Sequence, residues 1–345
     1  MSALATPRDL ESTWAPVRGV HELLERRRGR SSGRAYAAIR WAGAAIFAAV
    51  FVALLVVLSR DAAAALGHMG LSVVWKGWNP AKGEYGAGVF VVGTLLTTLV
   101  ALIIAVPIGL GTAALLSELA PRWLASPLTV LVEFLAAIPS IVVGLWGLIV
   151  LTPVFAHRVE PFLKGVPGLN VVFHGQPLGA SILLAGVVLA VMVLPTVVAL
   201  SRVAMSGVAE ADREAGLALA ATRWQVTRKV VIPGARRGIR ASVTLAMGRA
   251  LGEAIAVAMV IGNNTAIPHS LLSPGATLGS AIVNSFSEAN PGTLEKSGVV
   301  GLVVVLLAIS VLVNAGGQVL LRTRKPPIPA RGPVEGLAVA IGPVS

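Results

Sequence analysis

Six long apolar blocks shape this sequence and limit its fold more than any other feature. Each block is long enough to cross about 30 Å of hydrocarbon as a helix, at about 1.5 Å per residue. Backbone groups inside lipid must bond within the chain, and the alternating pattern of barrel strands is absent, so we predict an all-α polytopic membrane protein. The six predicted transmembrane helices cover residues 35–58, 89–117, 128–154, 178–200, 241–267 and 297–321.

The composition excludes several other classes of protein. Hydrophobic residues make up 55% of the 345 residues and charged residues only 13%, whereas a soluble domain carries about 25% charged residues. The chain contains no cysteine, so disulfides and thiolate metal sites are excluded, and none of the five histidines has the spacing of a metal motif. We therefore expect neither a metal nor a cofactor.

The placement of Lys and Arg predicts the orientation in the membrane. With both termini in the cytoplasm, the inner segments hold 20 basic residues and the outer loops hold six, which follows the positive-inside rule. The net charge of +12 is therefore explained by the membrane, and no nucleic-acid partner is expected. Residues 1–34 are predicted to form a basic cytoplasmic arm, 35–321 the transmembrane domain, and 322–345 a disordered cytoplasmic tail rich in Pro and Gly.

Three prolines fall inside predicted helices. Pro107, Pro139 and Pro195 lie within the second, third and fourth spans. Each removes a backbone hydrogen bond, so each is expected to kink its helix.

The loop between the fourth and fifth spans differs from the others. It covers residues 201–240 and lies on the predicted cytoplasmic side. Residues 210–219 favour helix and carry acids near their start. A second helical piece is predicted over 222–231, ending at Pro233. Two short helices joined by a turn would form a protrusion and not a further span.

This loop resembles the permease subunits of ABC importers, whose pattern is Glu-Ala-Ala-x3-Gly-x9-Ile-x-Leu-Pro. In that family the loop forms a coupling helix that docks on a separate ATPase subunit, and the resemblance implies the same ABC importer permease fold here. The resemblance assigns ATPase coupling to Glu214, Ala215, Gly216, Ala220, Arg223 and Pro233.

Two residues depart from the family pattern. Gly216 stands where the family usually has Ala, and Ala220 stands where it usually has Gly. A glycine at the second place would allow a positive φ, so with Ala220 we expect a strained turn or one of a different type. The alternative interpretation is a basic amphipathic loop that lies on the inner leaflet.

Further segments resemble the phosphate-specific transport family, of the PstC type, over about residues 72–320. The match with Trp75–Leu95 involves the first outer loop and second span, that with Glu133–Gly147 the third span, and that with Met247–Ala254 the fifth. The resemblance implies phosphate as the substrate. It also implies a homologous second permease, ATPase subunits, an extracytoplasmic phosphate-binding protein and a lipid bilayer as partners.

Arg249 and Glu253 are the candidate substrate-pathway residues. They lie inside the predicted fifth span, four positions apart, and should share one face of that helix. Charged groups at such depth should face the bundle interior or a water-filled path. The forked donors of arginine suit phosphate oxygens, and a nearby carboxylate would help the anion to leave. The alternative is a structural ion pair that locks this helix to a neighbour.

No Gly-x4-Gly-Lys-[Ser/Thr] motif is present, so the chain is expected to hydrolyse no ATP itself and to depend on a partner for hydrolysis. Other functions stay open at this point: a permease for another oxyanion such as molybdate or sulfate, a secondary transporter or channel, or a membrane scaffold. Secondary transporters usually show internal repeats, and no repeat of fixed period is found.

Overall fold

The computed structural model describes residues 30–69, 75–168, 172–290 and 292–322. Most of the predicted basic arm, at 1–29, and the tail at 323–345 lie outside the described residues. Within the described part, five helices are long and apolar enough to cross a membrane, not the six predicted. They are Tyr36–Ala63, Gly88–Leu119, Ser140–Gly165, Ile182–Ser206 and Leu294–Val319.

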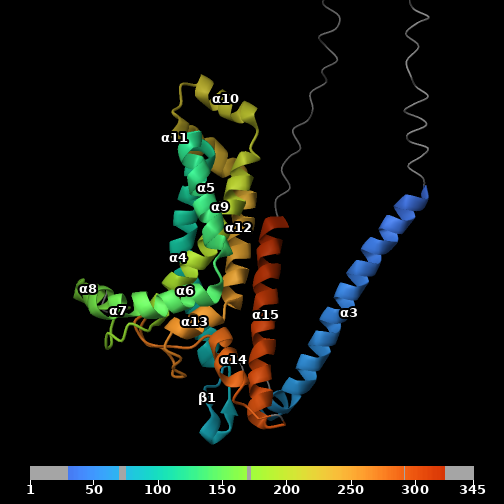
Figure 1. The fold of residues 1–345 in the computed structure, drawn as a ribbon, viewed down its shortest axis with the longest axis vertical. Helices are drawn as coiled ribbons and strands as arrows, with labels where there is room; N and C mark the ends of the chain where they lie inside the picture. The colour runs from blue at the N-terminus through green and yellow to red at the C-terminus, as the bar shows by residue number, and fades with distance from the viewer. Residues whose placement is uncertain (1–29, 70–74, 169–171, 291, 323–345) are drawn as a thin grey trace, which may run out of the picture. The chain divides into compact units, whose positions relative to one another are not determined.

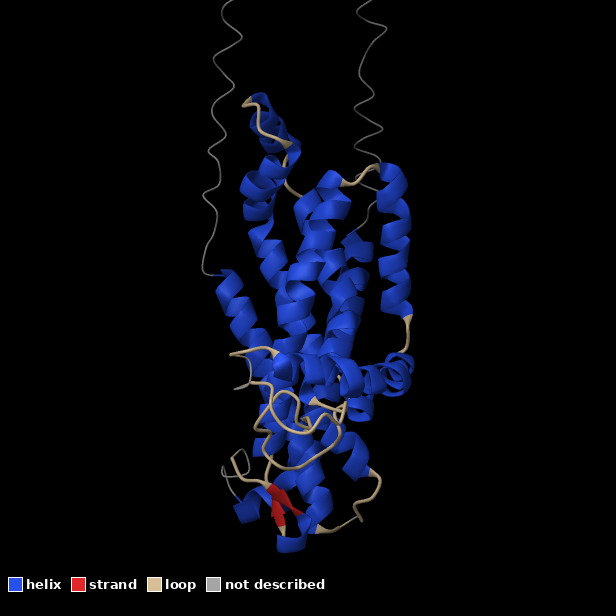
Figure 2. Cartoon of the chain, turned by 90° about the vertical axis from the view of Figure 1, so that its left-hand side faces the viewer, coloured by secondary structure: helices blue, strands red, loops and turns tan. Residues whose placement is uncertain are grey.

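The chain divides into two compact units, residues 1–58 and 59–345. The first predicted span forms helix α3 (Arg30–Met69), which begins inside the segment predicted as the basic arm. The remaining elements belong to the second unit. They are almost entirely helical, as Figure 2 shows.

Helices α4 (Gly88–Ala114) and α9 (Ile182–Ser206) pack together at the centre of this unit. Small residues allow the close approach: a Cβ added to Gly109 would lie 2.7 Å from Val197 Cγ1. The buried aliphatic side chains of α9, such as Val188 and Val193, form the largest core cluster with residues of neighbouring helices. Both helices contain a proline without a break in their helical run.

The predicted third span is broken at Pro139. Helix α5 (Arg122–Ala137) ends before it, and Ile138 adopts an extended conformation with ψ of 126°. After Pro139 the chain forms α6 (Ser140–Trp146), a π turn, α7 (Thr152–Val154), a second π turn and α8 (Glu160–Gly165). Figure 1 shows α5 along the long axis of the unit and α6 to α8 crossing it. A continuous span over 128–154 is therefore wrong.

The predicted fifth span is also broken. Helix α12 (Ile232–Gly252) ends at Glu253, whose φ of −73° and ψ of 126° are extended, and α13 (Ile255–Val260) follows. Helix α14 (Leu278–Phe286) packs on this break, since a Cβ added to Gly279 would lie 2.8 Å from the Glu253 carbonyl oxygen. This break, together with the several arginines of α12, accounts for the difference between six predicted spans and five apolar helices.

The last helix, α15 (Leu294–Arg322), packs beside α12. A two-stranded antiparallel hairpin, β1 (Trp78–Asn79) and β2 (Glu84–Tyr85), precedes α4. Figure 1 places this hairpin at the end of the unit opposite to α10 (Glu210–Ala218) and α11 (Arg223–Val226), the short helices of the loop that follows α9.

Candidate functional site

Helix α10 (Glu210–Ala218) lies within the residues predicted to be helical, and it ends in a Schellman motif. The Ala221 N–H donates to the Gly216 carbonyl at 3.3 Å, and the Ala220 N–H donates to the Leu217 carbonyl at 2.9 Å. This motif requires a left-handed residue at the position of Ala220, which is usually glycine. Ala220 adopts a φ of +59°, so the strained form of the turn is the one that the chain uses.

Gly216 faces the next helix, α11 (Arg223–Val226). A Cβ added to Gly216 would lie 3.0 Å from Val226 Cγ2, so glycine lets α10 and α11 approach closely. Thr222 starts α11 with a capping box, in which its hydroxyl accepts from the Gln225 N–H and the Gln225 side chain accepts from the Thr222 N–H. The departure at Gly216 thus allows α10 to approach α11 closely, whereas the departure at Ala220 leaves a strained turn.

The second helical piece does not end at Pro233 as predicted. Helix α11 continues through the π turn η7 (Thr227–Val231) directly into α12. Pro233 is the second residue of α12 and lies in its first turn, where proline is well tolerated. The chain therefore connects the protruding segment to α12 without a loop.

The coupling residues predicted from the family pattern lie mostly on the surface of this segment. Exposed side chains include Glu214, Ala215, Arg223 and Pro233. Leu219, at the tip of the turn, is 85% exposed, and Trp224 is 53% exposed. Exposed apolar side chains at a helical tip are typical of a surface that another protein covers.

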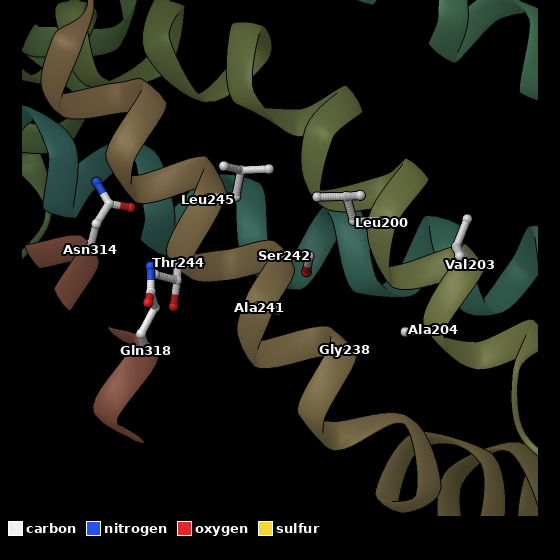
Figure 3. A pocket seen from close by; sticks show the side chains of 10 residues that line it. All are labelled: Leu200, Val203, Ala204, Gly238, Ala241, Ser242, Thr244, Leu245, Asn314 and Gln318. Carbon is white, nitrogen blue, oxygen red and sulfur yellow. The ribbon is translucent and has the colours of Figure 1, made fainter. Parts of the chain in front are cut away.

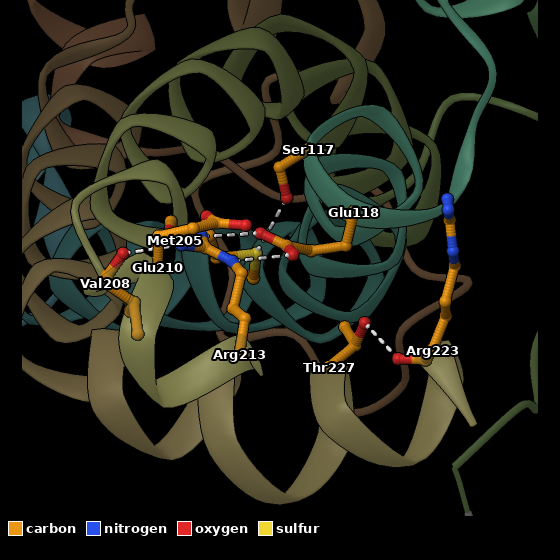
Figure 4. A network of polar contacts seen from close by, with 8 residues as sticks. All are labelled: Ser117, Glu118, Met205, Val208, Glu210, Arg213, Arg223 and Thr227. Carbon is orange, nitrogen blue, oxygen red and sulfur yellow. Dashed lines mark hydrogen bonds and ion pairs between the residues drawn. The ribbon is translucent and has the colours of Figure 1, made fainter. Parts of the chain in front are cut away.

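A network around Arg213 was missed by the sequence interpretation. Arg213 of α10 makes a two-pronged ion pair with Glu118, with Nε–Oε2 and Nη2–Oε1 distances of 3.1 and 3.0 Å (Figure 4). Its Nη atoms also donate to the carbonyl oxygens of Val208, at 2.5 Å, and Met205, at 2.8 Å. Arg213 and Glu118 are 95 residues apart in the chain, so no local spacing could have revealed the pair.

The environment keeps Arg213 charged. The hydrogen bonds with Glu118 raise the pKa of Arg213 above its ordinary value, and burial opposes this effect only in part. The side chains of Arg213 and Glu118 are 14% and 10% exposed. Both line a cavity of about 220 Å³ with Arg223 and Thr227 of the following turns.

Arg249 and Glu253 do not share one helix, contrary to the prediction. Arg249 is exposed near the end of α12, and Glu253 is the half-buried residue at which the helix has ended. The ion pairs in the described residues are those of Arg213 with Glu118 and Glu210. Within this part of the chain, Arg249 and Glu253 therefore form no ion pair.

The position of Arg249 along the neighbouring helix α15 follows from the contact that Gly248 makes with that helix. A Cβ added to Gly248 would lie 3.0 Å from the Asn314 side chain of α15. Asn314 is eight residues before the end of α15, or about 12 Å along the helix. The apolar span of α15 ends at Val319, so Arg249 lies at a level inside that span, about 7.5 Å from its end.

A groove of about 510 Å³ lies along α12, between α9 and α15 (Figure 3). Gly238, Ala241 and Leu245 line it from α12, and Asn314 and Gln318 line it from α15. Arg249 follows Leu245 by one helical turn on the same exposed face. On α12 the lining of the groove ends at Leu245 and does not include Arg249.

Comparison with known proteins places the chain in a family. Residues 105–325 match the family described as binding-protein-dependent transport system inner membrane component. The chain belongs to this family. Since it also has five apolar helices in its described part, this family member is a multi-pass inner-membrane protein and a membrane component of a transport system.

Two relatives of this family member show the extent of the similarity. The phosphate transport system permease protein PstC of Haemophilus influenzae is 41% identical over 240 residues, covering 68% of this chain and 76% of the relative. A PstC-type phosphate transport system permease of Mycobacterium tuberculosis is 36% identical, covering 83% of this chain and 94% of the relative.

A solved structure shares the fold. A crystal structure of a bacterial alginate ABC transporter, in complex with an alginate pentasaccharide-bound periplasmic protein, contains a chain with a TM-score of 0.51 to this one. The identity is 13%, over 82% of this chain and 94% of the other. At this identity the likeness supports the permease fold alone.

Proposed function

We propose that this chain is a permease subunit of an ATP-driven importer and forms, with a homologous permease, the pathway for inorganic phosphate. The observation that carries the proposal is the similarity to permeases of phosphate transport systems over most of both chains. The chain itself has no nucleotide-binding motif, so a partner ATPase would hydrolyse ATP. A binding protein would deliver phosphate on the side of the β1 hairpin.

Arg249 is the proposed phosphate-contacting residue of the pathway. Its guanidinium is exposed on α12 at a level where a charge in lipid is costly, and it forms no ion pair with the residues that the structure describes. Such a group is stable only next to water or a partner, and its forked donors match phosphate oxygens. Glu253, near the break after α12, would moderate anion binding so that phosphate can also leave.

The α10–α11 segment is the proposed ATPase contact. Glu214 and Arg223 are exposed on it, and the exposed Leu219 supplies an apolar anchor. The excess of basic residues in the segments on this side supports a cytoplasmic location for this segment and for both termini. An ATPase docked here would act on α12 through the unbroken connection at η7.

The test is ATP-dependent phosphate uptake by membrane vesicles that hold the full complex. We expect Arg249→Gln to assemble and lose most uptake, and Arg249→Lys to retain part of it. Arg240→Gln, another exposed arginine of α12, is the matched control and should transport normally. Glu214→Lys should lose both uptake and substrate-stimulated ATP hydrolysis.

The outcomes separate the parts of the proposal. Normal uptake by Arg249→Gln would remove Arg249 from the pathway. Uptake of molybdate or sulfate but not phosphate by the wild type would refute phosphate as the substrate while leaving the importer in place. No ATP-dependent uptake of any oxyanion would overturn the importer itself.

A further inference from the structure

We propose that Arg213 and Glu118 are positioning residues that transmit the displacement of α10 to the transmembrane helices. This inference rests on the proposed function, because it concerns how ATP-driven movement of α10 reaches the pathway. Neither residue belongs to the family pattern from which the coupling residues were predicted.

Helix α10 is held to the rest of the chain by few apolar contacts. Its nine residues include none that is buried. Gly216 contacts Val226 of α11, and Val226 in turn packs in a core cluster with Ala113 and Met205, so this apolar contact reaches the membrane helices only through α11. The fork of Arg213 is therefore the main direct attachment between α10 and the membrane helices in the described structure.

The fork reaches two different membrane helices. One side pairs with Glu118, which lies in the π turn η4 (Leu115–Leu119) that continues α4. Nη2 of the same side also donates to the carbonyl of Met205, in the last turn of α9. Because α4 and α9 pack along each other at the centre of the unit, a pull on Arg213 acts on both central helices together.

The turn that carries Glu118 is itself fixed in place. The Ala120 N–H donates to the Leu115 carbonyl at 2.7 Å and closes the π turn. The Ser117 hydroxyl lies 3.7 Å from the Met205 sulfur, which joins η4 to the end of α9. A π turn often marks a functional position in a helix, and here it directs Glu118 toward α10.

The chemistry of the pair requires arginine. A guanidinium holds a carboxylate with two parallel hydrogen bonds, which fix direction as well as distance. Three of its nitrogens are used here, and they also satisfy two backbone carbonyls. Lysine would keep the charge and lose the fixed geometry, so charge and geometry can be separated by substitution.

The experiment uses the complete complex in proteoliposomes and measures phosphate taken up per ATP hydrolysed. We expect Glu118→Gln and Arg213→Lys to retain ATP hydrolysis while uptake per ATP falls at least about fivefold, the lower range of typical coupling between sites. Glu210→Gln is the matched control, because Glu210 also pairs with Arg213 but its side chain is 75% exposed. This control should leave uptake per ATP unchanged.

A charge exchange keeps the test decisive. The double variant Arg213→Glu/Glu118→Arg should recover uptake per ATP relative to Arg213→Glu alone. Unchanged uptake per ATP in both Glu118→Gln and Arg213→Lys would overturn the inference, provided that the wild type transports phosphate. Loss of the assembled complex in the single variants and the exchange alike would also overturn it, by showing that the pair serves assembly. A wild type without phosphate uptake would refute the proposed function instead.

Discussion

Replacing Ala220 by glycine should stabilise α10, because the backbone there already has a glycine-like conformation. The φ of Ala220 is +59°, and a left-handed conformation costs a residue with a Cβ about 1–2 kcal/mol. Glycine would remove that cost and lose about 0.5–1 kcal/mol through the greater freedom of its unfolded chain. The central values of the two terms leave a net gain of about 0.5–1 kcal/mol for the end of α10.

Hydrogen exchange of the purified full chain can detect a change of this size. If the amides of α10 exchange through local opening, a gain of about 0.5–1 kcal/mol slows them roughly two- to fivefold. Peptides from α10 in Ala220→Gly should show this slowing, while peptides from α15 should be unchanged. Thermal unfolding of the whole protein would be a weaker readout, since it averages over the transmembrane helices.

A substitution at a neighbouring position gives the matched control. Ala218 is the last helical residue of α10 and is also exposed. Ala218→Gly should speed exchange of the same peptides, because glycine within a helix costs about 0.5–1 kcal/mol. If Ala220→Gly exchanged as fast as the wild type or faster, the argument from the Schellman turn would be wrong.

Two further predictions concern the break after α12 and the charge of Arg213. Gly279→Ala should destabilise the chain by about 1–3 kcal/mol through overpacking, because its Cβ would meet the Glu253 backbone at 2.8 Å, whereas Gly301→Ala, with nothing within 4 Å, should not. Thermal unfolding in detergent would show the difference, and equal melting temperatures would contradict it. The raised pKa of Arg213 means that its stabilising charge is complete below its unfolded pKa and is lost only as pH rises through the higher folded value. The stability difference between wild type and Arg213→Gln should therefore stay constant from about pH 6 to about pH 9, and a marked change across this interval would show that another group controls the pair.

Hydropathy predicted where the apolar helices lie but not where two of them break. Glu253 is extended within an apolar run that continues on both sides. One extended residue hardly changes hydropathy, and the break is stabilised by Gly279, which is distant in sequence. At Pro139 the sequence indicated a kink, and the structure has a complete interruption before α6.

The coupling segment was predicted more closely than the pathway because its signals are local. Helix propensity predicted α10. The departure at Ala220 predicted a strained turn or one of a different type, and the φ of +59° shows the strained form. The Arg213–Glu118 pair joins residues 95 positions apart in the chain, so no spacing in the sequence could predict it. The same limit applies to Arg249 and Glu253, whose predicted i, i+4 relation depended on a helix that ends between them.

Two structural connections lead from α10 to the membrane, and they end at different places. Helix α11 continues through η7 into α12, which reaches Arg249 about 26 Å from its start at Ile232. Arg213 instead joins α10 to α4 and α9 through Glu118 and Met205. A movement of α10 that used only the first connection would shift α12 relative to the central helices. A movement that used both would carry α12, α4 and α9 as one body. In the proposed importer, the Arg213 pair would therefore determine which of these motions ATP hydrolysis drives.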